Sequence, residues 1–563
     1  MREAIWTTKS MLRCRGVIET WSLRFQTILF LEILMKKNIF ALSVAAALAG
    51  FAGSAAAGVP FIAAHGANGI ATDNVATQFE VNAGGVGHVL LTPYYTVQGG
   101  RNTLLNIVNT DTVNGKAVKV RFRGARNSDD VLDFYVFLSP NDVWRARVYQ
   151  DGDLTRLDIP EDTSCTLPTA VELNDKKHAF KTVRVFNRDQ AEVREGYIEF
   201  LTAADIVPPS ADGKGGALYK ATKHDRRGVV SCNMDALTAA TKMLSDQDAA
   251  KAVGLGFPTT GLIGHWAIVD VAKNTSVSGL NTALQAVTDK GKPGYGNLVV
   301  APQDAVSAPR SWTSADGAGA GTTDPLLTWS AGKPARIKAA HFDFPDLSTP
   351  YVHTANALAP AGNAAAHQVN QLSSALAVTR VYNEFMTGQS VNLKTDWVFT
   401  MPTRRYAVAI DYADGGSLVE NAQSAFFSAE NVSFKKNGGA PHLEIPLVPD
   451  YYDSEERTLN VTTSPADGNV LAGEVTVVSF NEPVGSNTVL GAQIATHSVY
   501  PSIQLESITA GWASVPFSNQ LVTEGLSQVD DAYKGLGLPV IGYATFTAGN
   551  AALGFTWPHR YNK

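Results

Sequence analysis

Val118-Lys119-Val120-Arg121-Phe122-Arg123 alternates strictly between apolar and basic residues. Successive side chains of a β-strand point to opposite faces, so this stretch predicts a strand with an apolar row facing inward and a basic row facing outward. Shorter alternating rows fill much of 87–148, and turn signals at 112–116 and 139–142 separate them. Short strands joined by tight turns predict an antiparallel β-sandwich and not a parallel sheet.

Strand-like segments continue along the rest of the chain, interrupted by two helical patterns. Residues 235–253 are rich in Ala and Leu; Asn233 or Asp235 is a potential N-cap, Gly254 a potential end, and 245–246 a potential break. Residues 363–378 show a second helical spacing, whereas 207–227 is predicted to be a surface loop. The predicted fold class is therefore mainly β, with antiparallel, Ig-like sandwich units and short helical insertions.

The N-terminal region has the layout of a secretory signal peptide that starts at Met35. Two lysines follow Met35, an apolar run covers 39–51, and small residues precede a cleavage site between Ala57 and Gly58. We therefore expect 1–34 to be an upstream extension from a misplaced start codon, 35–57 to be removed, and the protein to be exported. The alternative is a membrane-anchored N-terminus that combines 28–34 with 39–57, although the lysines divide that stretch.

The remaining chain is expected to form three portions. These are an N-terminal β-sandwich (58–205), a middle β portion with helical insertions (206–440) and a C-terminal β portion (441–563). The last two portions are expected to be weakly separated and to be capable of sharing one core.

Charge and hydropathy exclude some classes of partner. The chain has 46 basic and 52 acidic residues, and removal of 1–57 leaves 39 and 49. Such an acidic chain has no general attraction for nucleic acid or anionic lipid. After residue 57 no apolar run is long enough to predict a transmembrane helix.

Cys165 and Cys232 are the two cysteines that follow the predicted leader. They allow one intramolecular disulfide, which would persist outside the cytoplasm. The alternative is a pair of buried free thiols.

Motifs for catalysis or metal binding are sparse, and no catalytic residue is predicted. The serine-hydrolase elbow, the zinc-protease motif and the phosphate loop are all absent from the sequence. A weak metal candidate combines His341 and Asp343 with Asp346. Calcium is the one cofactor left open, at two acidic runs that also fit solvated loops. Their residues are Asp151, Asp153 and Asp158, and Asp450, Asp453, Glu455 and Glu456.

Aromatic and basic residues offer two further hypotheses. Exposed aromatic rings would suit sugar stacking, although their positions beside apolar runs favour core packing; they are Tyr94, Tyr95, Trp144, Trp266, Trp397 and Trp557. Arg121, Arg123, Arg145 and Arg147 form a predicted basic stripe, which either faces solvent or meets an acidic neighbour such as a second copy of the chain.

Several stretches together resemble a family of exported bacterial cell-surface proteins of unassigned biochemical function. They are LLTPYY (90–95), TLLNIVNT (103–110), VRFR (120–123), NSDDVLDF (127–134), SPNDVW (139–144), DWVFTMPTRRY (396–406) and GLPVIG (537–542). The resemblance implies a secreted or surface-attached β protein and carries over no catalytic residue.

We therefore expect an exported, non-enzymatic protein of the cell surface with a structural or adhesive role. Its expected partners are further copies of itself or other envelope components. Two alternatives remain: a secreted carbohydrate-binding or glycan-acting protein, and an outer-membrane β-barrel. The barrel would require longer and more regular strands than this sequence suggests.

Overall fold

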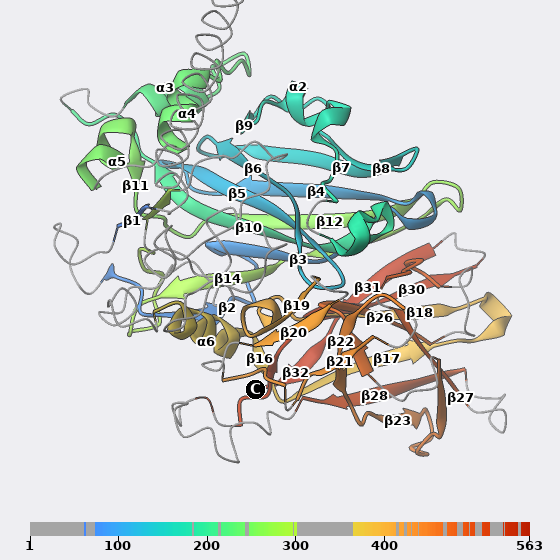
Figure 1. Ribbon diagram of the computed structural model, residues 1–563. Coiled ribbons are helices and arrows are strands. Elements are labelled where there is room, and N and C mark those ends of the chain that lie inside the picture. Colours follow the sequence, from blue (N-terminus) through green and yellow to red (C-terminus); the bar gives the residue numbers. More distant parts are fainter. Residues whose placement is uncertain are drawn as a thin grey trace, which may run out of the picture. The chain divides into compact units, whose positions relative to one another are not determined.

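The alternating stretch lies in strand β5 (Gly115–Gly124), near the middle of an eight-stranded sheet (Figure 1). In the computed structural model β5 pairs antiparallel with β10 (Glu195–Ile206) and β6 (Asp130–Leu138). The sheet continues with β3 (Val89–Thr96), β14 (Thr282–Val287) and β2 (Gln78–Val81) on one side, β9 (Cys165–Leu167) on the other, and β11 (Leu255–Gly256) beside β10.

A five-stranded antiparallel sheet faces the first one. Its order is β13 (Thr275–Leu280), β12 (Leu262–Asp270), β4 (Asn102–Asn109), β7 (Val143–Asp151) and β8 (Leu154–Asp158). The turns expected around Asn114 and Asn141 therefore do not close hairpins within one sheet. Each carries the chain from one sheet to the other, because β4 and β7 belong to the second sheet and β5 and β6 to the first.

The two sheets share one hydrophobic core. Val118, Val120 and Phe122 pack in it with Trp144 and Trp266 of the five-stranded sheet. The predicted apolar face of β5 is thus confirmed, as is the mainly β, antiparallel class. Strands β12, β13 and β14 follow residue 205 yet belong to these two sheets, so the sheets extend across the boundary expected there.

Helices cover the other face of the eight-stranded sheet. Three of them pack against Ala117, Phe137 and Ala203: α3 (Gly216–Thr222), α4 (Met234–Thr241) and α5 (Gln247–Val253). A fourth helix, α6 (Ala364–Leu376), packs against Leu91 and Leu201. The predicted caps are confirmed: Asn233 accepts a hydrogen bond from the Ala236 amide, and Gly254 has a φ of 92°. α3 was missed, since it lies within the predicted loop.

The C-terminal strands form further sheets that share a second core. A six-stranded sheet has the order β24 (Val461–Ser464), β27 (Thr496–Pro501), β26 (Val475–Ser479), β18 (Lys394–Thr400), β30 (Ile541–Ala548) and β31 (Leu553–Pro558). A four-stranded sheet has the order β23 (Asp450–Asp453), β28 (Ala510–Pro516), β17 (Arg380–Met386) and β32 (Arg560–Asn562). Val398 of β18 packs in the first core and its neighbours Trp397 and Phe399 in the second, so this strand is buried on both faces.

Smaller elements complete the described chain. The three-stranded sheet comprises β21 (Ser433–Lys435), β22 (His442–Pro446) and β25 (Val470–Ala472); the paired strands are β1 (Phe61–Ala63) with β15 (Leu298–Val300), β16 (Ala377–Val378) with β29 (Leu538–Pro539), and β19 (Val408–Asp411) with β20 (Ser417–Glu420). The short helices are α2 (Ala170–Leu173), η3 (Gln98–Gly100), η4 (Lys176–His178), η5 (Phe186–Arg188), η6 (Gln190–Val193), η8 (Gln389–Val391) and η9 (Arg404–Tyr406).

The structure describes residues 61–63, 74–300 and 364–563. Gaps within these ranges are 183–184, 212–215, 242–246, 297, 413–415, 421–424, 430, 437–438, 465–469, 481–487, 495, 502–508, 518–532, 534 and 550–552. Residues 59–563 form one compact unit, and the predicted leader lies outside the described residues.

Candidate functional site

The basic row of β5 is buried, so the prediction that it faces solvent is wrong. Lys119 pairs with Asp133 at 2.6 Å, Arg121 with Asp130 at 2.9 Å, and Arg123 with Glu199 at 3.4 Å, and all six side chains are at most 2% exposed. The physical reason is that this face of the sheet is covered: helices pack on it beside Ala117 and Leu201, and Arg123 contacts Tyr406 of η9. Each buried cation therefore needs a carboxylate partner inside the protein. Arg121 and Arg123 are therefore unavailable to an external partner.

The other two arginines of the predicted stripe lie on β7, in the five-stranded sheet. Arg147 pairs with Asp158 of β8 at 2.6 Å, and its guanidinium lies 4.4 Å from the centre of the Tyr149 ring. Arg145 is exposed, and within the described residues no hydrogen bond or ion pair of its guanidinium is found. Among the described residues, Arg145 is thus the one arginine of the predicted stripe whose guanidinium has no ion-pair partner.

Arg145 lines a depression of about 710 Å³ on the outer face of the five-stranded sheet. Two rows of side chains cross the strands there. In one row Arg145 is opposite Asn106, which is opposite His265, which is opposite Leu280. In the next row the order is Asp158, Arg147, Leu104, Ala267 and Ser278. Residues directly opposite have Cβ atoms about 5 Å apart, so each row is nearly continuous.

The depression combines exposed apolar and polar groups. Leu104 is 40% exposed and Leu280 is 65% exposed, although large apolar side chains normally avoid water. The sequence alone did not single out Leu104, Asn106, His265 or Leu280. Their strands were recognisable, but the cross-strand register that brings them together is a property of the folded sheet.

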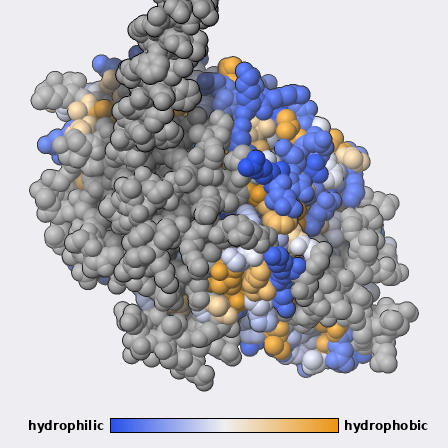
Figure 2. Space-filling model, viewed as in Figure 1, coloured by the Kyte–Doolittle hydropathy of each residue, from blue (hydrophilic) through white to orange (hydrophobic). Residues whose placement is uncertain are grey.

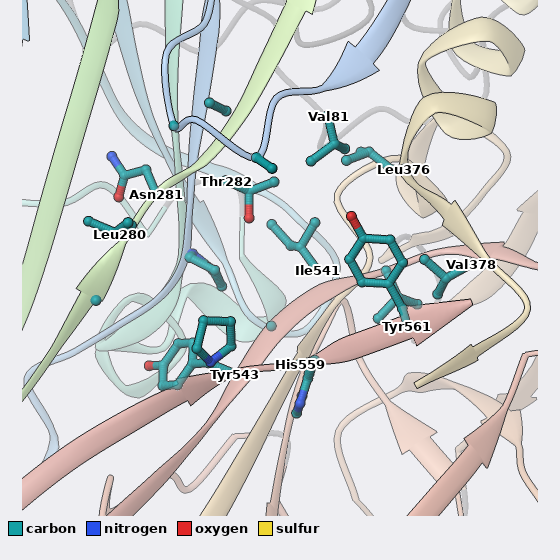
Figure 3. Close-up of a pocket in the computed structure, with 18 of the residues that line it drawn as sticks. Val81, Leu280, Asn281, Thr282, Leu376, Val378, Ile541, Tyr543, His559 and Tyr561 are labelled. Carbon is teal, nitrogen blue, oxygen red and sulfur yellow. The ribbon is translucent and has the colours of Figure 1, made fainter. Parts of the chain in front are cut away.

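A small pocket of about 200 Å³ lies between β14, β30, β32 and α6 (Figure 3). Figure 3 shows Val81, Leu376, Val378 and Tyr561 on one side and Leu280 and Asn281 on the other. This volume is somewhat larger than the roughly 150 Å³ of an engineered cavity that binds benzene. The pocket and the depression share Trp266, Gly279 and Leu280 in their walls.

The charge state of this pocket is close to neutral. Burial lowers the pKa of His559 to about 3, and its ring nitrogens already contact the Val398 carbonyl at 3.0 Å and the Asn383 amide at 2.9 Å. Lys563 is the one charged side chain among the described residues of the lining, and its ammonium donates to the Ala375 carbonyl at 3.0 Å. These residues suit an apolar occupant better than an ionic one.

The disulfide expected between Cys165 and Cys232 is present. Cys165 begins β9 at the edge of the eight-stranded sheet, and Cys232 lies just before α4. The bond therefore fastens the helices α3–α5 to the sheet that they cover. The signal cleavage site between Ala57 and Gly58 lies outside the described residues and stays a prediction.

The acidic runs considered for calcium are paired with basic side chains. Asp151 contacts Arg156 and Lys176, Asp153 contacts Arg194, Asp450 contacts Arg380, and Arg457 contacts both Asp453 and Glu455. Within the described part of the chain no group of three or more candidate ligands is placed to hold a metal ion. His341, Asp343 and Asp346 lie outside that part.

Most of the aromatic residues considered for sugar stacking are in the core. Tyr94, Tyr95, Trp144, Trp266 and Trp397 are at most 2% exposed, so core packing is confirmed for them. Trp557 packs in the second core and is half-buried. One stacked aromatic pair was missed: Trp512 of β28 is 39% exposed and stacks on the half-buried Tyr452 of β23, with 4.5 Å between ring centres. A signal was present in the sequence, since the alternation of Ala513, Val515 and Phe517 places Trp512 on the opposite face of the strand.

No protein-family model, curated protein or solved structure matches the chain. In the described residues no helix is long and apolar enough to cross a membrane. Figure 2 shows one side of the molecule, where hydrophilic residues gather around α2, β7 and β8. The residues and surfaces described above are therefore the basis for proposing a function.

Proposed function

We propose that the protein is an exported, non-enzymatic component of the cell surface with a structural or adhesive role. The observation that carries this proposal is the disulfide between Cys165 and Cys232. Disulfides persist in oxidising compartments and are rare in the cytosol. The signal-peptide pattern at 35–57 supports the same compartment independently.

The packing supports a structural role. Two facing sheets share one core, and this packing supports the proposal of a sandwich; that the sandwich is Ig-like stays a prediction. Buried ion pairs such as Arg404 with Glu474, at 2.9 Å, add geometric constraints between distant segments. A fold that is constrained by such ion pairs suits a protein that resists mechanical force or displays a binding surface.

Fractionation of the native host tests this proposal. We expect the chain in an envelope or extracellular fraction, with Gly58 as its first residue by mass spectrometry and with Cys165 and Cys232 protected from alkylation until a reductant is added. An intact chain in the cytosol, with both thiols open to alkylation, would contradict it.

The stacked pair of exposed Trp512 and half-buried Tyr452 favours carbohydrate binding as a second candidate. Both rings lie on the outer face of the four-stranded sheet, where Glu384 is the cross-strand neighbour of Trp512. Asp450 and Arg380 pair at 3.2 Å on the same face. An aromatic surface beside charged hydrogen-bonding groups is suited to a sugar ring, whose faces are apolar and whose edges are polar.

A glycan array of the purified protein tests the second candidate. Trp512→Ala should abolish any glycan signal, whereas Tyr295→Ala, an aromatic of similar exposure elsewhere, should leave it unchanged. An array without any signal, or a signal that Trp512→Ala does not alter, would exclude this surface as a glycan site.

A further inference from the structure

We propose that the depression on the five-stranded sheet is the surface through which two copies of the chain associate. The proposal deepens the structural role proposed above and rests on it. The occupant is a second copy, and the lining residues that carry the argument are Arg145, Asp158, His265, Leu104 and Leu280.

The charges of this surface favour an occupant that carries both signs of charge. Arg145 offers a guanidinium that is exposed to solvent. Asp158 lies on the same face as Arg145, and its side chain stays 26% exposed in its ion pair with Arg147. A twofold axis brings the same patch of both copies together, so a patch that bears both signs is able to pair with itself.

Leu104 and Leu280 would provide the apolar part of the interface between the two copies. Leu104 and Leu280 are exposed in two adjacent rows, with the smaller Ala267 between their strands. Arginine is enriched at protein interfaces, and the leucines beside it add apolar surface that a partner would cover. Covering them with a second copy would remove both leucines from water.

The size of the face predicts a weak association. Five strands about 4.8 Å apart and five to nine residues long give a face of roughly 20 by 24 Å. Two such faces would bury on the order of 1,000 Å² in total, at the lower end of specific interfaces. We therefore expect a concentration-dependent dimer with a dissociation constant in the micromolar range, not an obligate dimer.

Sedimentation velocity of the purified protein over a range of concentrations tests this inference. Arg145→Glu and Leu104→Asp should each raise the dimer dissociation constant by at least about tenfold, because one introduces charge repulsion and the other buries a carboxylate. Arg226→Glu is the matched control: it makes the same charge change at an exposed arginine outside the depression, and it should leave the constant unchanged. Circular dichroism checks that all variants fold.

A wild-type chain that stays monomeric over the whole concentration range would overturn the inference, as would a dimer that both variants leave intact. A monomer that binds an acidic polymer through Arg145 would assign the depression to another occupant and would also overturn it. Fractionation separates the two proposals: a monomer found at the cell surface removes only this inference, whereas a cytosolic chain removes the proposed function.

Discussion

Arg405 and Asp129 form a buried ion pair across 276 positions of sequence, with 3.2 Å between the guanidinium Nη1 and a carboxylate oxygen. The Tyr412 hydroxyl donates to the other oxygen of Asp129 at 2.7 Å, and Arg405 also donates to the Asn127 carbonyl at 2.9 Å. These contacts join the turn after β5 to the segment around η9 and β19. Burial raises the pKa of Asp129 to about 6, which reflects how completely water is excluded.

Replacing Arg405 by Met should destabilise the protein strongly. The variant leaves Asp129 buried without its cation, which typically costs about 3–5 kcal/mol. Urea denaturation monitored by tryptophan fluorescence would measure the loss. The double variant Arg405→Met with Asp129→Asn should recover part of it, because no buried charge then lacks its partner. A loss below about 1 kcal/mol for the single variant would show that the pair is dispensable.

Removal of the disulfide should loosen the helices α3–α5. The bonded cysteines are 67 positions apart, and a crosslink over such a loop stabilises by roughly 4 kcal/mol in the chain-entropy model. Cys165→Ala with Cys232→Ala should lower the melting temperature and increase proteolysis near 216–253. Addition of a reductant should lower the melting temperature of the wild type and leave the double variant unchanged.

Gly196 should not tolerate a larger side chain. A Cβ atom at this position would lie 1.7 Å from the Arg123 carbonyl oxygen of the paired strand. Gly196→Ala must therefore separate β10 from β5 and should cost at least about 2 kcal/mol in the free energy of unfolding. Gly439→Ala is the control, since no atom lies within 4 Å of its Cβ, and it should change stability by at most about 0.5 kcal/mol. Equal melting temperatures for the two variants would contradict the close approach.

Asp396 should make the stability of the protein fall as pH rises from about 4 to about 6. Burial raises the pKa of Asp396 to about 6 in the folded state, whereas an unfolded Asp titrates near about 3.9. Between these values the folded state binds the proton more tightly, so stability declines with rising pH, by on the order of 2–3 kcal/mol at most, and is constant above that window.

Asp396→Asn isolates this contribution because the amide cannot ionise. The Asn oxygen can still accept the hydrogen bond from the Leu490 amide, which is 2.8 Å long in the wild type. Other buried carboxyls titrate alike in both chains, so the wild type should lose more stability than the variant across the window. Denaturation curves at several pH values measure both slopes, and identical slopes would rule out a raised pKa.

The strands and helices could largely be predicted from local pattern. Strict alternation identified the core face of β5, because side chains of a strand alternate between its two sides. Asn233 and Gly254 marked the ends of the helical region, since an N-cap and a left-handed glycine satisfy the free backbone groups there. The candidate surface was harder to find: Arg145 was singled out, but Leu104, His265 and Leu280 come together only through the register of neighbouring strands.

The sequence by itself determined which side chains of each strand share a face, and which cysteines were able to pair once the leader is set aside. Only the tertiary structure decided whether a second layer covers a face. On β5 the basic row is buried beneath other parts of the chain, and ion pairs compensate its charge. On β7 the outer face stays open, and Arg145 stays in water. Alternation is local, whereas burial depends on residues hundreds of positions away, and this is why the same pattern had two different outcomes.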